Sequence, residues 1–352
     1  MRKLLLSTGA ILLAQTGAAM AQEEIRVSVV NGHPPVFLWV KHLTETFIPT
    51  VDQALEGTDY QISWTENYGG TLAAVGGELE ALEDGLAEVG VVPTVFEPTA
   101  LPLQNVSYFT PFSSGDPRLV MATMDKLYAD VPAMTEAWDK YGLAYLGGGF
   151  TLDNYVLMTT FPVNSIDDLS GKRIAAPGPA VNWLEGTGAV GVSGNLTTYY
   201  SDIQTGVFEG VITFPTAASP AKLQEVAPYT TVTNFGAQYA GAVVANGDWF
   251  AEQPEEVQNA LREGAKAYTA AYLDEQEQRV AAAMEVLDTD EGGVSEMDDA
   301  EKKRWADALP QIAKTWADAA GEEGLDGAGV LDAYIGGLQD GGAPLLRDWR
   351  ED

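Results

Sequence analysis

The chain of 352 residues contains no cysteine, two histidines and only 19 lysines and arginines. The absence of cysteine excludes disulfides, thiolate zinc sites, iron–sulfur clusters, thiol nucleophiles and a lipid anchor on cysteine. With only His33 and His42, a histidine-rich metal site is also not expected, and we predict neither a cofactor nor a metal ion. The 51 aspartates and glutamates leave a net charge of −32. Such an acidic chain lacks the basic clusters that nucleic acids and anionic lipids require.

The first 21 residues have the features of a cleaved secretion signal. Two basic residues open the chain, an apolar stretch follows over 4–13, and Ala19-Met20-Ala21 supplies the small-x-small pattern of a cleavage site. We predict a signal peptide over 1–21, cleaved after Ala21, and hence export to the periplasm. The alternative is an uncleaved membrane anchor, but polar residues interrupt the apolar stretch before it reaches the roughly 20 residues that span a bilayer.

Two stretches of the chain show alternating strand and helix patterns. Strands are expected over 24–30, 60–65 and 89–95, and again over 154–158, 172–176 and 210–214. A helix is expected over 36–55, and a strand over 143–146 is expected to end at the glycines 147–149. This alternation indicates parallel α/β sheets, whose ligands bind beyond the carboxyl ends of the strands. A helical stretch over 249–287 is long enough to bridge both units at about 1.5 Å per residue. We therefore predict an α/β protein with two similar lobes.

The order of these elements also suggests where the lobes divide. We expect the first lobe to comprise 22–150 plus 240–280, because strands near 230–234 and 240–246 return toward it. The second lobe would comprise 151–239 plus 281–340, and 341–352 would be a C-terminal tail. Beyond a helix over 298–320, the Gly-rich sequence favours short helices at best.

Two motifs that could carry chemistry have simpler structural interpretations. The segment 186–191 has the spacing GxGxxG, but it follows a helical pattern, whereas a dinucleotide loop must follow a strand. We interpret it as a glycine-rich turn. Residues 288–299 partly match a calcium loop, but Gly292 stands where an oxygen ligand is needed, and Asp299 replaces the bidentate glutamate. A solvated acidic loop is the better interpretation.

The candidate binding residues lie at the ends of predicted strands. His33 directly follows the first strand, where it could be a ligand-facing donor, a capping group or a catalytic base. Aromatic residues at other strand ends could each either close the core or face a ligand. Several of them converging on one cleft would form the largely apolar pocket that is typical of small-molecule sites. These aromatic candidates are Tyr68, Phe96, Tyr155, Phe214 and Phe235.

The second stretch carries a resemblance to a known family. The segment 164–189 contains Asp168-Leu169, Gly171 and Pro177, and the segment 199–234 contains Tyr200, Ile203-Gln204, Gly206, Glu209-Gly210 and Glu225-Val226. In these motifs the chain resembles the substrate-binding subunits of TRAP (tripartite ATP-independent periplasmic) transporters, of the dicarboxylate-binding (DctP-like) type. Residues 76–82 and 105–112 also fit that family. The resemblance therefore covers nearly the whole mature chain.

The resemblance implies a type II-like periplasmic-binding-protein fold whose lobes close around a solute. In the family, an arginine of the second lobe grips the ligand's carboxylate with its planar fork. The motif places this arginine at Ala175 and a second one at Tyr155, so both are absent here. Arg173 is the candidate replacement, because residues two apart in a strand share a face. The predicted ligand-binding set is His33, Tyr68, Thr94, Phe96, Tyr155, Arg173, Thr213, Phe214, Asn234 and Phe235.

We therefore predict a non-enzymatic solute receptor that delivers its ligand to a TRAP membrane permease and works as a monomer. Without the family arginines, a monocarboxylate, an aromatic acid or a neutral polar solute is expected rather than a dicarboxylate, since a buried anion needs a charged partner. The alternatives are an exported hydrolase that uses paired carboxylates, such as Asp167-Asp168, and a sensory binding protein on the same fold.

Overall fold

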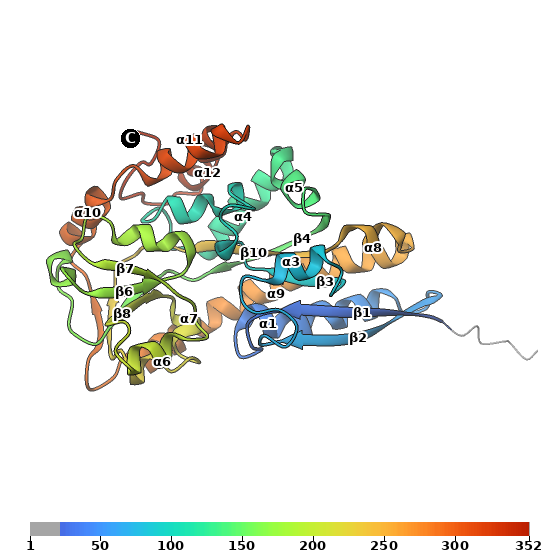
Figure 1. Cartoon of the computed structure of the whole chain (residues 1–352), viewed down its shortest axis with the longest axis horizontal. Coiled ribbons are helices and arrows are strands. Elements are labelled where there is room, and N and C mark those ends of the chain that lie inside the picture. The colour runs from blue at the N-terminus through green and yellow to red at the C-terminus, as the bar shows by residue number, and fades with distance from the viewer. Residues whose placement is uncertain (1–21, 352) are drawn as a thin grey trace, which may run out of the picture.

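Two separate sheets organise the protein (Figure 1). The computed structural model describes residues 22–351, so the predicted signal peptide lies outside the described residues. The first sheet has the order β2-β1-β3-β10-β4. Its strands are β1 (Glu23–Asn31), β2 (Tyr60–Tyr68), β3 (Val89–Val92), β4 (Leu143–Leu152) and β10 (Gln238–Asn246). We call the part of the molecule built around this sheet the first lobe.

The second sheet has the order β11-β9-β5-β8-β6-β7 and forms the second lobe. Its strands are β5 (Val156–Thr159), β6 (Arg173–Ala176), β7 (Val190–Ser193), β8 (Gly210–Thr213), β9 (Tyr229–Val232) and β11 (Gly293–Glu296). Both sheets are mixed. In the first, β1 pairs in parallel with β2 and β3, whereas β10 is antiparallel to β3 and β4 because it returns from the second lobe. The predicted α/β class is confirmed.

Helices cover the sheets of both lobes. The α-helices are α1 (Leu38–His42), α2 (Ile48–Ala54), α3 (Glu78–Glu83), α4 (Pro117–Asp130), α5 (Pro132–Asp139), α6 (Tyr199–Gln204), α7 (Pro215–Ala218), α8 (Gly247–Glu252), α9 (Glu255–Leu287), α10 (Asp299–Ala308), α11 (Ile312–Glu322) and α12 (Gly327–Asp340). Short 3-10 segments add η2 (Thr94–Phe96), η3 (Leu103–Phe109), η4 (Ile166–Leu169), η5 (Gly178–Leu184) and η6 (Leu223–Glu225), and η1 (Leu43–Phe47) is a π-helical turn. Within residues 22–351, no helix combines the length and the apolar composition that crossing a bilayer requires.

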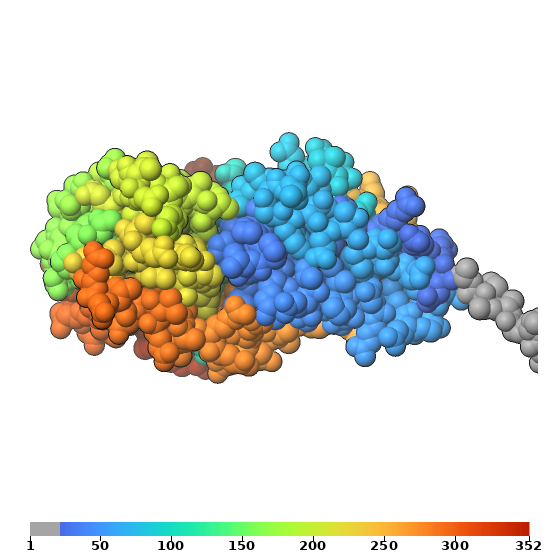
Figure 2. All heavy atoms as spheres, turned by 90° about the horizontal axis from the view of Figure 1, so that it is seen from below, coloured from blue at the N-terminus to red at the C-terminus, as the bar shows by residue number. Residues whose placement is uncertain are grey.

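The long helix α9 contacts both lobes. It packs against β4 and α2 of the first lobe and against α7 and β11 of the second. In Figure 2 it runs beneath the boundary between the first lobe and the second. Its approach to β4 depends on glycine, because a Cβ on Gly148 would lie only 2.2 Å from the carbonyl oxygen of Ala265. The helix therefore connects the two lobes while packing against β4, the edge strand of the first sheet.

Two local predictions are wrong. The glycines at 147–149 were expected to end a strand, but β4 continues through them by a bulge, where Gly147 has a φ of +86° that favours glycine. The C-terminal region was expected to hold short helices at best, yet α12 has 14 residues. It packs against α4 and η3, which belong to residues 22–150. The following tail is also anchored, since the Trp349 indole donates to the carbonyl of Pro111 at 2.8 Å.

Candidate functional site

A pocket lies between the two lobes and is lined by both. About 30 Å³ of free space remains between its side chains, which is room for no more than a few water molecules, so the lobes would have to move apart to admit a solute. The first lobe contributes His33, Trp39, Pro93, Val95, Phe96, Phe150, Leu152 and Ala240, and the second contributes Tyr155, Pro177, Asn195, Leu196, Tyr199, Ile212, Thr213 and Phe214. The pocket is thus placed where closure of two lobes would enclose a solute.

The loop after β1 is held rigidly and presents His33 to this pocket. Gly32 has no room for a side chain, since a Cβ would lie 2.4 Å from the backbone nitrogen of Val75. The buried carboxylate of Glu78 accepts hydrogen bonds from the backbone N–H groups of Gly32 (2.8 Å) and Gly76 (2.7 Å). Asn31 accepts from the N–H of His33 at 2.9 Å. Glu78 therefore fixes the loop from the start of α3.

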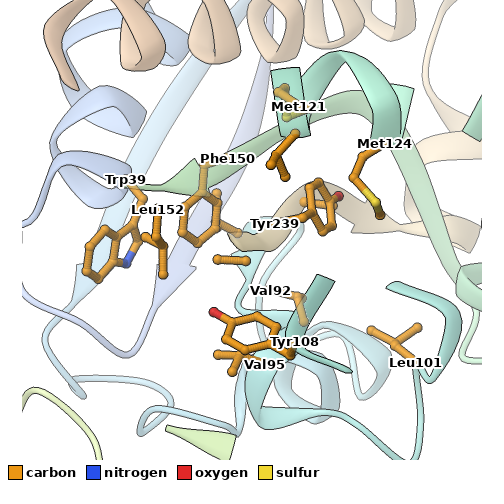
Figure 3. Close-up of a cluster of buried hydrophobic side chains, with 14 of the residues drawn as sticks. Trp39, Val92, Val95, Leu101, Tyr108, Met121, Met124, Phe150, Leu152 and Tyr239 are labelled. Carbon is orange, nitrogen blue, oxygen red and sulfur yellow. The ribbon is translucent and has the colours of Figure 1, made fainter. Parts of the chain in front are cut away.

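Stacked aromatic rings form the first-lobe wall of the pocket. The Trp39 ring is parallel to that of Phe37, with centroids 4.9 Å apart, and nearly parallel to that of Phe150 at 5.7 Å. Figure 3 shows Trp39, Leu152 and Phe150 side by side, with Tyr108 and Val95 below them. The strand β4 places Phe150 and Leu152 on one face because alternate residues share a face. This wall is broad, rigid and apolar.

The second-lobe wall is built around the end of β8 and the start of α7. Phe214 lies 5.2 Å from Tyr155 and 6.0 Å from Trp39 between ring centroids, so it touches aromatic rings of both lobes. The hydroxyl groups of Tyr155 and Tyr108 are 3.1 Å apart and form a buried hydrogen bond between the lobes. Burial raises the pKa of Tyr155 well above its ordinary value, so its hydroxyl stays protonated.

The pocket is electrically neutral but contains polar atoms. None of the lining residues is an aspartate, glutamate, lysine or arginine. Burial lowers the pKa of His33 to about 3, so its imidazole is uncharged at neutral pH. Four lining residues carry a buried polar side-chain atom without a protein partner: His33 Nδ1, Trp39 Nε1, Tyr199 OH and Thr213 Oγ1. Buried polar groups are normally hydrogen-bonded, which makes these four atoms candidates for contact with a ligand.

Five of the ten predicted site residues line this pocket: His33, Phe96, Tyr155, Thr213 and Phe214. That they bind a solute stays a prediction. The other five lie elsewhere. Tyr68 ends β2 beside Asn31, and Thr94 is buried next to the lining residue Val95.

Three of the predicted residues make structural contacts outside the pocket. Arg173 opens β6 at an exposed position and donates to the carbonyl of Gly206 at 2.8 Å, whereas the pocket lies beyond the other end of that strand, at Pro177. Asn234 has a left-handed φ of +56° and accepts from the side chain of Asn154. Phe235 is buried in the core, edge-on to Trp305 at 4.9 Å.

The sequence analysis missed several prominent lining residues. Trp39 lies in a predicted helix and Phe150 after a predicted break, so neither was placed at a strand end. Tyr199 begins α6 and reaches the pocket from the second lobe. The unusual clustering of aromatic residues after β1 was the available signal, but mid-helix aromatics most often belong to a core.

Neither the GxGxxG segment 186–191 nor the acidic loop 288–299 lines this pocket. Gly186 follows η5, and the carbonyl of Ala308 would lie 2.2 Å from a Cβ at that position, so its glycine serves close packing. In the acidic loop, Asp288 accepts from the N–H of Val294 at 3.0 Å and so shapes the turn before β11. In the part of the chain that the structure describes, no group of three acidic or histidine side chains could hold a metal ion.

Comparisons with known proteins agree on one family. Residues 36–319 match the family model described as bacterial extracellular solute-binding protein, family 7. The C4-dicarboxylate-binding periplasmic protein DctP of Rhodobacter capsulatus is 27% identical over 255 residues, which cover 70% of this chain and 74% of that protein.

Solved structures show the same fold. The periplasmic ectoine-binding protein of the TeaABC TRAP transporter of Halomonas elongata has a TM-score of 0.76 at 18% identity, covering 90% of this chain and all of that one (100%). A TRAP periplasmic solute-binding protein of Bordetella bronchiseptica with bound mandelate has a TM-score of 0.74 at 22% identity, covering 90% and 99%. The chain belongs to the family 7 bacterial extracellular solute-binding proteins and is a substrate-binding protein of the TRAP type.

Proposed function

We propose that this receptor is exported, captures a small ring-bearing solute between its lobes and delivers it unchanged to a TRAP membrane permease. The observation that carries the proposal is the aromatic pocket, because its walls come from both lobes. A ligand that contacts both walls would stabilise the closed arrangement by its differential affinity. Delivery to a permease would then follow from opening and release.

The aromatic walls of the pocket support the flat shape of this solute. Flat rings of Trp39, Phe150 and Phe214 surround the space, and ring-bearing ligands pack well against such faces. The related fold accommodates mandelate in one protein and ectoine in another. These features are compatible with the solute classes expected from the sequence, which are a monocarboxylate, an aromatic acid or a neutral polar solute rather than an extended dicarboxylate.

The lining supports capture rather than hydrolysis. A hydrolase of the predicted alternative class needs two carboxyl groups at its substrate, and no aspartate or glutamate lines this pocket. The pair Asp167-Asp168 instead belongs to η4, where Asp168 accepts from the N–H groups of Asn164 and Ser165. Deletion of this chain distinguishes the remaining alternative, a sensory receptor on the same fold. Solute uptake should be lost if the chain is a transport receptor and retained if it is a sensory receptor.

A thermal-shift screen tests the proposed function directly. The panel contains succinate, mandelate, pyroglutamate, ectoine and a set of neutral ring amides. We expect at least one ring-bearing compound to raise the melting temperature, with a shift that grows with the logarithm of its concentration, as binding to the native state requires. Mass spectrometry should then recover that compound with unchanged mass. Chemical conversion of a hit, or stabilisation by succinate alone, would contradict the proposal.

A further inference from the structure

The absence of charged side chains from the pocket restricts the class of ligand that it can bind. All 16 lining residues are uncharged at neutral pH, including the deeply buried His33. A carboxylate enclosed here would lose its hydration and gain no cationic partner, which is unfavourable. The whole chain adds to this, because a net charge of −32 repels anions over long range.

Arg173, the basic residue nearest in sequence to Ala175, does not supply the positive charge of the missing family arginine. Arg173 stands at the opposite end of β6 from Pro177, and its guanidinium donates to the backbone of Gly206. At the position of the family arginine, Ala175 is fully buried and packs in a small apolar cluster with Tyr199 and Val211. A cationic side chain is therefore missing from the pocket, and apolar contacts fill the position where one was expected.

The unpartnered atoms indicate what the ligand supplies instead. Trp39 Nε1–H is a donor only, and it is buried without an acceptor. Tyr199 OH and Thr213 Oγ1 can each donate or accept, and both are also without a partner. These donors come from both lobes, so one acceptor-bearing solute could satisfy them only when the lobes are together.

We propose that the pocket takes an uncharged, ring-bearing solute that accepts hydrogen bonds from Trp39, Tyr199 and Thr213, such as a ring carboxamide or lactam. The inference rests on the proposed receptor function and narrows its solute class. The ring lies against Trp39, Phe150 and Phe214, and a carbonyl oxygen takes the indole hydrogen bond. Burying an uncharged carbonyl among neutral donors costs much less free energy than burying a carboxylate there.

Matched pairs of compounds test the charge directly. Isothermal titration at pH 7.5 compares mandelamide with mandelate, benzamide with benzoate, and pyroglutamamide with pyroglutamate, since each acid is ionised and each amide is neutral. We expect at least one amide to bind, and its acid to bind at least tenfold more weakly. An acid that binds as tightly as its amide would overturn the inference and leave the receptor function intact. No binding in either arm would overturn the inference and also count against the proposed function.

A pair of tryptophan variants tests the assigned donor. Trp39→Phe removes the indole N–H and keeps an aromatic ring, so the affinity for the binding amide should fall about tenfold. Trp64→Phe is the matched control, because Trp64 of β2 donates to Asp52 of α2 and lies outside the pocket. Equal amide affinity in Trp39→Phe and the parent protein would contradict the assigned hydrogen bond.

Discussion

At the scale of single residues, four polar atoms of the pocket have no hydrogen-bond partner within the protein. An unpaired buried hydroxyl costs about 1–3 kcal/mol of folding free energy. Thr213 carries such a hydroxyl, whereas Thr151, which is also buried, donates to the carbonyl of Pro117 at 3.1 Å. We therefore expect Thr213 to serve binding and Thr151 to serve stability.

Thr213→Val should separate these two roles. Valine has a similar shape and removes an unpartnered hydroxyl, so the free energy of unfolding should stay equal or rise by up to about 2 kcal/mol. Affinity for the solute should fall about tenfold. Thr151→Val should do the reverse, with reduced stability and unchanged affinity. Urea unfolding and calorimetric titration of both variants give the answer, and a destabilised Thr213→Val with full affinity would refute the binding role.

Glu78 makes the loop at His33 sensitive to pH. Burial raises the pKa of this carboxyl from 4.5 to about 7. A carboxyl whose pKa is higher in the folded than in the unfolded state stabilises the fold below the unfolded pKa, and that contribution is lost as the pH rises through the folded pKa. The unfolding free energy of the parent relative to Glu78→Gln should therefore fall between pH 5 and pH 8, by on the order of 3 kcal/mol.

Urea titrations of both proteins across this pH range measure that difference. The opposing contribution of neutral His33 is present in both proteins and cancels. Glu80→Gln provides the control, because Glu80 is exposed on the same helix. If the stability of the parent and that of Glu78→Gln changed in parallel with pH, the buried carboxyl would not titrate as described.

At the scale of elements, hydrophobic alternation and turn residues were enough to predict most strands, but close packing was not predictable. The glycines of β4 illustrate the difficulty. Gly147 permits a bulge and Gly148 permits contact with α9, and both functions look like a strand break in sequence. The helix α12 was missed for the same reason, since Gly337 lies where a Cβ would meet Thr123 at 2.8 Å.

The pocket was predictable only in part, for a related reason. Residues at strand ends, such as His33, Phe96 and Phe214, could be named because sheet topology sends them to one edge. Trp39 and Tyr199 lie on helical segments, and only tertiary packing turns them toward the space between the lobes. The position of Arg173 relative to the pocket could not be predicted from the sequence either, because sharing a strand face with Ala175 does not bring its side chain to the end of β6 that meets the pocket.

Two glycines in helices should respond in opposite ways to alanine. Gly264 of α9 lies where a Cβ would come within 2.6 Å of Val51 and 3.1 Å of the carbonyl of Phe47, whereas Gly336 of α12 has open space. Gly336→Ala should stabilise the protein by about 0.5–1 kcal/mol, since alanine is the better helix former. Gly264→Ala should destabilise it by about 1–3 kcal/mol through overpacking. Denaturant midpoints give both values, and a stabilised Gly264→Ala would mean that α9 does not pack this tightly.

At the scale of the whole molecule, the two lobes are connected by the helix α9 and share one aromatic pocket. The lobes meet through Phe214, through Tyr155 with Tyr108, and along α9. The lobes also share short crossing segments near Asn154 and Asn234, whose side chains are hydrogen-bonded to one another at 2.8 Å. Hinge motion is expected at such crossings, because a few residues at element ends absorb the change in backbone angles.

The absence of cysteine makes this motion directly measurable. Leu86 of the first lobe and Val207 of the second are both exposed and precede β3 and β8. They therefore lie at the strand ends opposite the pocket. Cysteines introduced at these two positions can carry nitroxide spin labels without competing thiols. Double electron–electron resonance then reports the distance between the lobes in the free and the liganded protein.

This distance measurement tests the central claim, that both lobes bind one solute between them. With a saturating amount of the compound that gives the largest thermal shift, we predict that the distance distribution narrows and its mean changes, while Trp39→Phe needs about tenfold more compound for the same change. A distance distribution that saturating ligand leaves unaltered would contradict the account.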